Sequence, residues 1–183
     1  MMKQFDVHSR GAKVARGVLA FAIGFGFVLL ATGVSPCWGQ DAASPKLALF
    51  AGAGADFSSG HSRGATQFGA SFEEAPPNAY FGMLFEVGYV GPWSSFKSGS
   101  AIFSANYVSS WSTDKKERFL PFATVGYSRL FGTGNAINFG GGLDYRLSHH
   151  HAIRFEVRDY DSLTGPRGHD LGIRVGWVIY IPD

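Results

Sequence analysis

The chain has 183 residues, about the length of one domain, and its 45% apolar content argues against disorder. Only 16% of the residues are charged, against roughly 25% in an ordinary soluble domain, while 25 residues are glycine, which destabilises helix interiors and so argues against a helical bundle. The single cysteine excludes a disulfide framework within the chain and a cysteine-rich zinc site, and a net charge of +2 lacks the basic excess of a nucleic-acid binder.

The first 39 residues predict a secretory signal peptide. A basic start is followed by an apolar stretch from Val18 to Val34, and the small residues Cys37 and Gly39 stand three and one positions before a cut after Gly39. The alternative is an uncleaved membrane anchor, although about 17 apolar residues is at the short limit for a spanning helix. We therefore expect a cleaved signal over residues 1–39 and a short periplasmic segment over residues 40–46.

The remainder of the chain alternates large apolar residues with small or charged ones, which is the side-chain period of a β-strand. The contrast is sharpest over residues 81–89, 137–147, 153–158 and 171–179, and weaker runs occupy residues 47–57, 66–73, 101–111 and 119–130. Segments rich in turn-forming residues separate these runs. Eight strands of about nine to twelve residues fit tilted membrane strands. We predict an all-β fold over residues 47–183, an eight-stranded antiparallel up-and-down transmembrane β-barrel.

Alternation alone does not tell which face of the closed sheet points outward. Glycine crowds the polar face and lysine is rare there, which suits a narrow lumen better than a solvated surface. Charges inside such a barrel must be paired, and the arginine fork suits a carboxylate. We predict a lumen charge network of three acids and four bases: Glu86, Asp144, Arg146, Arg154, Glu156, Arg158 and Arg174. The alternative for the same residues is a gated polar path through the barrel.

The apolar face is then the one that contacts lipid. Its predicted lipid-facing residues are Phe81, Phe85, Val87, Phe103, Phe139, Leu143, Ile153, Phe155, Val157, Ile173, Val175 and Trp177. Membrane barrels carry aromatic belts at both interfaces with water. We expect four aromatic residues near strand ends to lie at these interfaces: Tyr89, Trp111, Tyr145 and Tyr180.

Two neighbouring runs resemble a known family. The glycine-rich run 137–147, a short turn, and the Arg-x-Glu-x-Arg pattern of Arg154, Glu156 and Arg158 are similar to the small OmpA-like and OmpX-like barrels of Gram-negative outer membranes. The resemblance extends over about residues 47–181 and implies an eight-stranded barrel with a charged interior. The chain departs from that pattern in two ways. It shows no peptidoglycan-binding domain, so no cell-wall tether is implied. It also ends in Tyr180, Ile181, Pro182 and Asp183, where such barrels usually end in an aromatic residue.

Residues with catalytic or metal-binding chemistry do not fall into a decisive spacing. The three consecutive histidines, 149–151, cannot all reach one metal from regular structure, so we predict a solvated turn. His169 lies near Ser162, Asp161 and Asp170, and no spacing joins them into a nucleophile, base and orienting acid. We predict no cofactor, no metal and no enzymatic activity.

The sequence thus predicts an outer-membrane barrel with a structural or adhesive role, exercised through outward loops at residues 58–65, 91–99, 131–136 and 161–169. The expected partners are outer-membrane lipid and an extracellular molecule at the loops. Trp93 and Phe96 form an exposed apolar pair there that could contact such a molecule, although residues of this kind more often dip into the membrane interface. The main alternative is a secreted soluble barrel with an apolar ligand inside, which requires Phe85, Phe139, Phe155 and Trp177 to point inward. A lipid A-modifying barrel enzyme is the third possibility.

Overall fold

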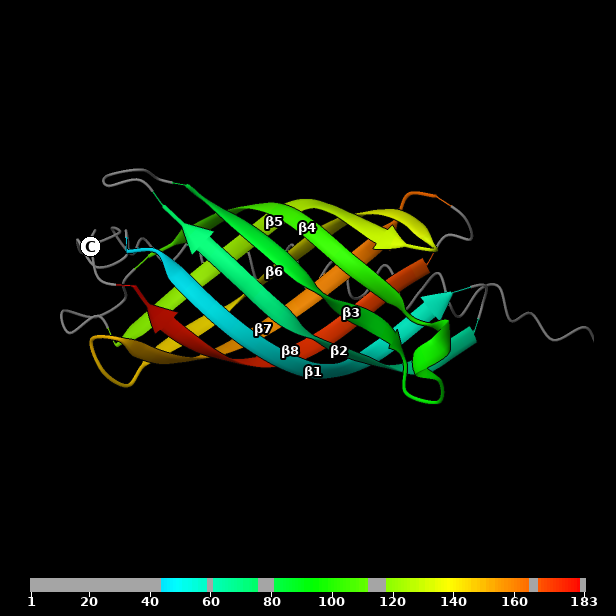
Figure 1. The fold of residues 1–183 in the computed structure, drawn as a ribbon, viewed down its shortest axis with the longest axis horizontal. Helices are drawn as coiled ribbons and strands as arrows, with labels where there is room; N and C mark the ends of the chain where they lie inside the picture. The colour runs from blue at the N-terminus through cyan, green and yellow to red at the C-terminus, as the bar shows by residue number, and fades with distance from the viewer. Residues whose placement is uncertain (1–43, 59–60, 76–80, 112–117, 165–167, 182–183) are drawn as a thin grey trace, which may run out of the picture. The chain divides into compact units, whose positions relative to one another are not determined.

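A computed structural model describes residues 44–58, 61–75, 81–111, 118–164 and 168–181; the predicted signal peptide lies outside the described residues. This part of the chain forms eight antiparallel strands that follow one another and close into a barrel (Figure 1). The strands are β1 (Lys46–Ser58), β2 (His61–Glu74), β3 (Gly82–Pro92), β4 (Ser100–Ser110), β5 (Phe119–Phe131), β6 (Gly134–Arg146), β7 (His151–Ser162) and β8 (Gly168–Tyr180), with a 3-10 turn, η2 (Phe96–Ser98), between β3 and β4. Because β8 pairs with β1, the sheet has no open edge.

No helix among the described residues is long and apolar enough to cross a membrane.

The pairing register determines how the strands tilt. A path that starts at Lys46 and steps across hydrogen-bonded partners from strand to strand returns to β1 at Asp56, ten residues further along. Such a stagger inclines the strands to the barrel axis, and Figure 1 shows them crossing the barrel obliquely. A closed barrel of eight strands leaves an interior just wide enough for side chains.

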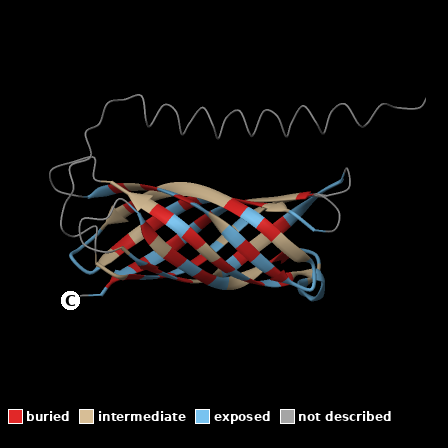
Figure 2. Ribbon diagram, turned by 90° about the horizontal axis from the view of Figure 1, so that it is seen from above, coloured by how far each residue is buried: buried red, intermediate tan, exposed pale blue. Residues whose placement is uncertain are grey.

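Side chains alternate between the lumen and the outer wall along each strand. On β3, Leu84 and Glu86 are buried, whereas Phe85 and Val87 are exposed. The same alternation produces the bands of buried and exposed residues in Figure 2. Even-numbered residues face the lumen on every strand except β2, where odd-numbered residues do, because the register on either side of β2 pairs even with odd positions.

Several strands extend beyond the sequence pattern into segments that were expected to form loops. Residues 58–65 were expected to form a loop, but β2 begins at His61, and Asp56 pairs with Arg63. Likewise β3 continues to Pro92, β6 begins at Gly134, β7 continues to Ser162 and β8 begins at Gly168. The reason is that backbone pairing continues past the point where apolar alternation ends, because the ladder requires only N–H and C=O groups.

The β5–β6 connection is a turn of two residues, 132 and 133. Gly132 and Gly134 have φ angles of 99° and 135°, which L side chains rarely adopt. A Cβ on Gly134 would also lie 1.9 Å from Oγ1 of Thr164, so this turn depends on glycine.

Candidate functional site

The outer wall of the barrel is apolar. Phe85, Phe155 and Trp177 are 39%, 50% and 44% exposed, whereas a soluble ligand-binding barrel would bury them. The structure therefore has the opposite facing to the soluble alternative. All twelve residues predicted to contact lipid are exposed or half-buried, eleven at outward strand positions and Phe81 just before β3: Phe81, Phe85, Val87, Phe103, Phe139, Leu143, Ile153, Phe155, Val157, Ile173, Val175 and Trp177.

Three of the four predicted interfacial aromatics lie at outward positions near strand ends. Tyr89 is near the end of β3, Tyr145 is near the end of β6, and Trp111 directly follows β4. The prediction for Tyr180 is wrong, because this side chain is 3% exposed and lies inside the barrel. Tyr180 shares the lumen-facing parity of Val178 on β8, so strand alternation outweighs its position near the end of the chain.

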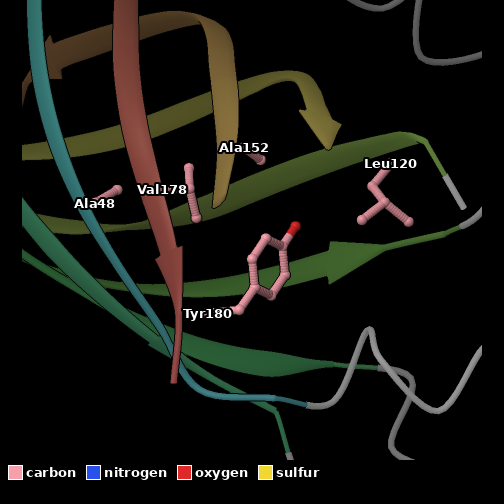
Figure 3. Close-up of a cluster of buried hydrophobic side chains, with 5 residues drawn as sticks. All are labelled: Ala48, Leu120, Ala152, Val178 and Tyr180. Atoms are coloured by element: carbon pink, nitrogen blue, oxygen red, sulfur yellow. The ribbon is translucent and has the colours of Figure 1, made fainter. Parts of the chain in front are cut away.

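Apolar side chains occupy one end of the lumen, where β1 starts and β8 ends. Figure 3 shows this small cluster, drawn from five positions: Ala48, Leu120, Ala152, Val178 and Tyr180. The guanidinium of Arg146 lies over the Tyr180 ring, 4.5 Å from its centre. Arg146 was predicted to belong to the lumen charge network. The structure places its guanidinium against Tyr180 instead, at the end of the barrel where β1 starts and β8 ends.

Next to these residues lies the first of two buried ion clusters, which we call the lower cluster: Lys46, Glu73, Asp144 and Arg154. Arg154 binds Asp144 with two hydrogen bonds, from Nε and Nη2, of 2.7 and 2.8 Å. The same Nη2 donates to Glu73 at 2.8 Å, and Lys46 Nζ donates to the other Glu73 oxygen at 2.6 Å. All four side chains are at most 4% exposed, so these contacts replace water around the charges.

The second group, the upper cluster, lies further along the lumen and consists of Glu86, Glu156, Arg158 and Arg174. Arg174 binds Glu86 through both terminal nitrogens, at 2.9 and 3.0 Å, and donates to Glu156 at 2.7 Å. Arg158 donates from Nε to Glu156 at 2.8 Å and is also ion-paired with it through Nη2. Bidentate arginine–carboxylate pairs of this kind are among the stronger hydrogen-bonded contacts in proteins.

Neutral groups complete the upper cluster. The Tyr160 hydroxyl donates to Glu86 at 2.6 Å, and Arg158 Nη1 donates to the Asn138 side-chain oxygen at 2.6 Å. Asn138 in turn donates to the Ser128 hydroxyl at 2.8 Å. Glu86 and the Arg158 guanidinium are therefore each bonded to more than one group, which offsets part of the cost of burying their charges.

An aromatic ring lies against the central arginine of each cluster. The guanidinium of Arg154 is 4.3 Å from the centre of the Phe122 ring, and that of Arg174 is 4.1 Å from the centre of the Phe50 ring. A guanidinium over a ring face is stabilised by the ring's quadrupole, most strongly where water is excluded. These rings fill lumen space beside the ion pairs.

Glycines on the lumen wall make room for the long polar side chains. A Cβ on Gly52 would lie 2.9 Å from Cγ of Arg174, and one on Gly140 would lie 3.0 Å from Nε of Arg158. Such distances are shorter than ordinary Cβ contacts, so a larger residue would displace the arginines. This explains physically why glycine crowds the polar face in the sequence.

The structure brings six of the seven predicted network residues into the two clusters and adds others. Sequence reasoning missed Lys46 and Glu73, because Lys46 precedes the first alternating run and β2 is weakly patterned. It also missed Tyr160 and Asn138. Tyr160 could have been found, since it stands two positions after Arg158 and so faces the same side of β7.

The residues considered for catalysis are only partly brought together. His169 Nδ1 lies 3.1 Å from Asp159 Oδ2, and its Nε2 lies 3.8 Å from Asp161 Oδ1. These three occupy outward positions, whereas Asp170 has lumen-facing parity. Within the described part of the chain, no serine or threonine hydroxyl bonds to His169, so Ser162 does not complete a triad.

The histidine turn shows no metal site. His149 and His150 are exposed, and the ring of His151 packs on Trp177 with centres 5.4 Å apart. In the described ranges, no group of three or more histidine, cysteine, aspartate or glutamate side chains is arranged to hold a metal ion.

No protein-family model and no curated protein sequence matches this chain. Solved structures do. Neisserial surface protein A has a TM-score of 0.57 and 10% identity, covering 75% of this chain and 97% of that chain. The chain has the fold of the small outer-membrane barrels. The N-terminal β-barrel domain of Pseudomonas aeruginosa OprF has a TM-score of 0.52 at 13% identity, covering 74% of this chain and 97% of its own.

Ail, the attachment invasion locus protein of Yersinia pestis, is similar to the same extent, with a TM-score of 0.52, 10% identity, and coverage of 75% of this chain and 97% of Ail. The prediction of an eight-stranded antiparallel up-and-down barrel is confirmed by the strand order and by these structures. At identities of 10–13%, the similarity shows a shared fold only, and the roles of these proteins are not transferred to this chain.

Proposed function

We propose that this chain is an outer-membrane barrel with a structural role in the envelope. The observation that carries the proposal is the facing of the barrel, with apolar side chains exposed outside and ion-paired side chains buried inside. In lipid, every backbone polar group must be satisfied within the protein, and a sheet closed by β1–β8 pairing does this. Residues 1–39 are then a cleaved export signal and residues 40–45 a short periplasmic segment; Lys46, which the sequence pattern assigned to that segment, is instead the first residue of β1.

The proposal includes a lumen plugged by the two clusters. Each cluster crosses the interior: Glu86 on β3 binds Arg174 on β8, and Glu73 on β2 binds Arg154 on β7. Eight strands leave room for side chains and little else. We therefore favour a structural network over a gated polar path for these residues.

Short connections favour a structural over an adhesive role. With the start of β1 in the periplasm, two of the outward connections contain only two residues each, 59–60 and 132–133. These two connections offer little chain outside the membrane to contact another molecule. We do not propose hydrolytic activity. His169 could act as a base oriented by Asp159, but among the described residues no hydroxyl nucleophile is hydrogen-bonded to His169.

Heat modifiability tests the membrane barrel. Outer membranes containing the chain are extracted in detergent, and boiled and unboiled samples are compared on a gel. A closed lipid-facing barrel stays folded until boiled, so the unboiled band should migrate at a different position. Recovery from the soluble periplasmic fraction, with no shift on boiling, would contradict the proposal.

Conductance across a planar lipid bilayer tests the plug separately. We expect no stable current steps after insertion of the purified protein, because the paired charges fill the lumen. Boiled and unboiled gel bands from the same preparation control for folding. Reproducible single-channel steps from folded protein would contradict the plug while leaving the membrane barrel intact.

A further inference from the structure

The connection between β3 and β4, residues 93–99, is the longest outward connection that the structure describes completely; we call it the β3–β4 loop. It contains two large apolar side chains, Trp93 and Phe96, which are 61% and 64% exposed. Exposure alone does not tell whether a side chain contacts water or lipid. The positions of the two rings relative to the outer wall of the barrel are therefore the evidence that matters.

Trp93 lies on the outer wall of β2. Its backbone N–H donates to Gly64 O at 3.0 Å, and its indole N–H donates to the carbonyl of Ala65. A Cβ on Gly64 would lie 3.3 Å from Cδ1 of the indole. Gly64 has the same outward parity as Phe68 on this strand, so the indole covers an outward-facing position and does not lie over the mouth of the lumen.

Phe96 lies against the outer wall of β3 in the same way. Its ring packs on the outward-facing Tyr89 ring, with centres 5.6 Å apart, and its carbonyl accepts a 2.8 Å hydrogen bond from the Tyr89 hydroxyl. Tyr89 also stacks on Phe68 of β2, at 5.2 Å. The three rings form a continuous aromatic row that runs from the apolar wall of the barrel into the loop.

Two glycines allow this close seating. A Cβ on Gly99 would lie 2.0 Å from the Tyr89 hydroxyl oxygen, and one on Gly91 would lie 2.5 Å from it. Within the loop, the Ser98 backbone N–H and hydroxyl both bond to Ser95 O, at 3.2 and 2.9 Å. The aromatic side chains are therefore held in place before any binding event, which lowers the entropy cost of binding.

We propose that the β3–β4 loop anchors the barrel in the lipid–water interface of the outer leaflet, with Trp93 and Phe96 inserted at the boundary between headgroups and acyl chains. The inference rests on the proposed membrane location. Tryptophan and tyrosine favour this boundary, because one part of each ring is apolar and the other is polar. The loop contains no acidic residue, and Lys97 places one positive charge beside the headgroup phosphates.

Tryptophan fluorescence in vesicles tests the placement. In the full chain, replacing Trp38, Trp111 and Trp177 with phenylalanine leaves Trp93 as the sole tryptophan. The matched control replaces Trp38, Trp93 and Trp111, which leaves Trp177 on the lipid-facing wall. Both chains are refolded into phosphatidylcholine vesicles with bromine either near the headgroup or deep in the acyl chain, and folding is checked by the heat-dependent band shift.

We expect Trp93 to lose emission most strongly with bromine near the headgroup and to resist quenching by aqueous iodide. If Trp177 is quenched by brominated lipid while Trp93 is quenched only by iodide, the anchor is wrong and the membrane barrel stands. If neither is quenched by lipid, the membrane barrel itself is wrong. If a triple variant fails to fold, the quenching of Trp93 is obtained as the difference between the native chain and a single Trp93→Phe variant.

A second variant tests the seating of the loop. Gly99→Ala should displace Tyr89 from the loop and increase quenching of Trp93 by iodide. Ser94→Ala, an exposed position in the same loop, is the matched control and should leave quenching unchanged. Equal iodide quenching of Trp93 in the Gly99→Ala chain and in its Ser94→Ala control would overturn the link between the aromatic row and the anchor.

Discussion

The lower and upper clusters each join two carboxylates to two cations in the same order, but they differ in the neutral groups that support them. In the lower cluster Arg154 bonds to both carboxylates, and Glu73 also accepts from Lys46. In the upper cluster Arg174 bonds to both carboxylates and Glu156 accepts from both arginines, while Tyr160 donates to Glu86 and Asn138 accepts from Arg158. Among the described residues, Asp144 of the lower cluster therefore depends on Arg154 for its hydrogen bonds, whereas Glu86 and Arg158 of the upper cluster each have a neutral partner as well. The number of buried ion pairs alone therefore does not tell which substitution is most damaging.

Arg154→Met should have the largest effect, because it removes the cation common to both carboxylates of the lower cluster. The hydrogen bonds of Asp144 within the described part of the chain come from Arg154, so this carboxylate would be left buried without a hydrogen-bonded cation. Breaking a buried pair in this way costs about 3–5 kcal/mol. The measurement is the free energy of unfolding in urea, in detergent micelles. Arg129→Met, at an exposed position, is the control, and an equal loss in both variants would contradict the role of the lower cluster.

Glu156→Gln should cost less, although Glu156 is the shared carboxylate of the upper cluster. Arg174 keeps both bonds to Glu86, and Arg158 keeps its bond to Asn138. The loss is then that of charged hydrogen bonds, about 1.5–3 kcal/mol. The same urea titration measures it. A loss as large as that of Arg154→Met would show that the upper cluster has no effective redundancy.

Gly52→Ala should destabilise the barrel by about 1–3 kcal/mol through crowding rather than loss of charge. The new Cβ would lie 2.9 Å from Cγ of Arg174 and 2.3 Å from the carbonyl oxygen of Ile173. Ala51→Val, one residue away at an exposed outward position, is the matched control. If both variants unfold at the same urea concentration as the parent, the lumen has more free space than the clusters imply.

Lys46→Met should have the smallest effect, about 1.5 kcal/mol, at the lower end for a charged hydrogen bond, because Glu73 retains its bond to Arg154. The same urea titration measures the change in the free energy of unfolding. A cost approaching that of Arg154→Met would reverse the order of importance inside the lower cluster and make the lysine its central cation.

The sequence was sufficient for the strands and their up-and-down order, because the alternating runs and the turn-forming segments between them are local. The facing of the barrel required a second observation, the abundance of glycine and scarcity of lysine on the polar face. The sequence was also informative where partners are neighbours in one hairpin or on one strand. Asp144 and Arg154 face each other across the β6–β7 pair, and Glu156 and Arg158 share a face of β7. These contacts follow from a short turn and from period-two geometry.

The cross-lumen contacts could not be predicted in the same way. Glu86 and Arg174 are 88 residues apart, and Glu73 and Arg154 are 81 apart. Which of them meet depends on the stagger accumulated around the whole barrel and on the parity change at β2. Neither quantity appears in any local stretch of residues, so pairing by charge alone leaves several partners equally possible.

The pairing of β8 with β1 has a consequence for biogenesis. The ladder joins Lys46 to Tyr180, and the backbone N–H of Ile181 adds a further bond to Pro45 O, so the first strand is completed only by the last. A chain that lacks β8 presents two unpaired edges, which are templates for pairing with other chains. Closure of the barrel therefore requires the last strand. Until β8 pairs with β1, both edges of the sheet are open to other chains, so the order of the strands leaves this exposure to the end of folding.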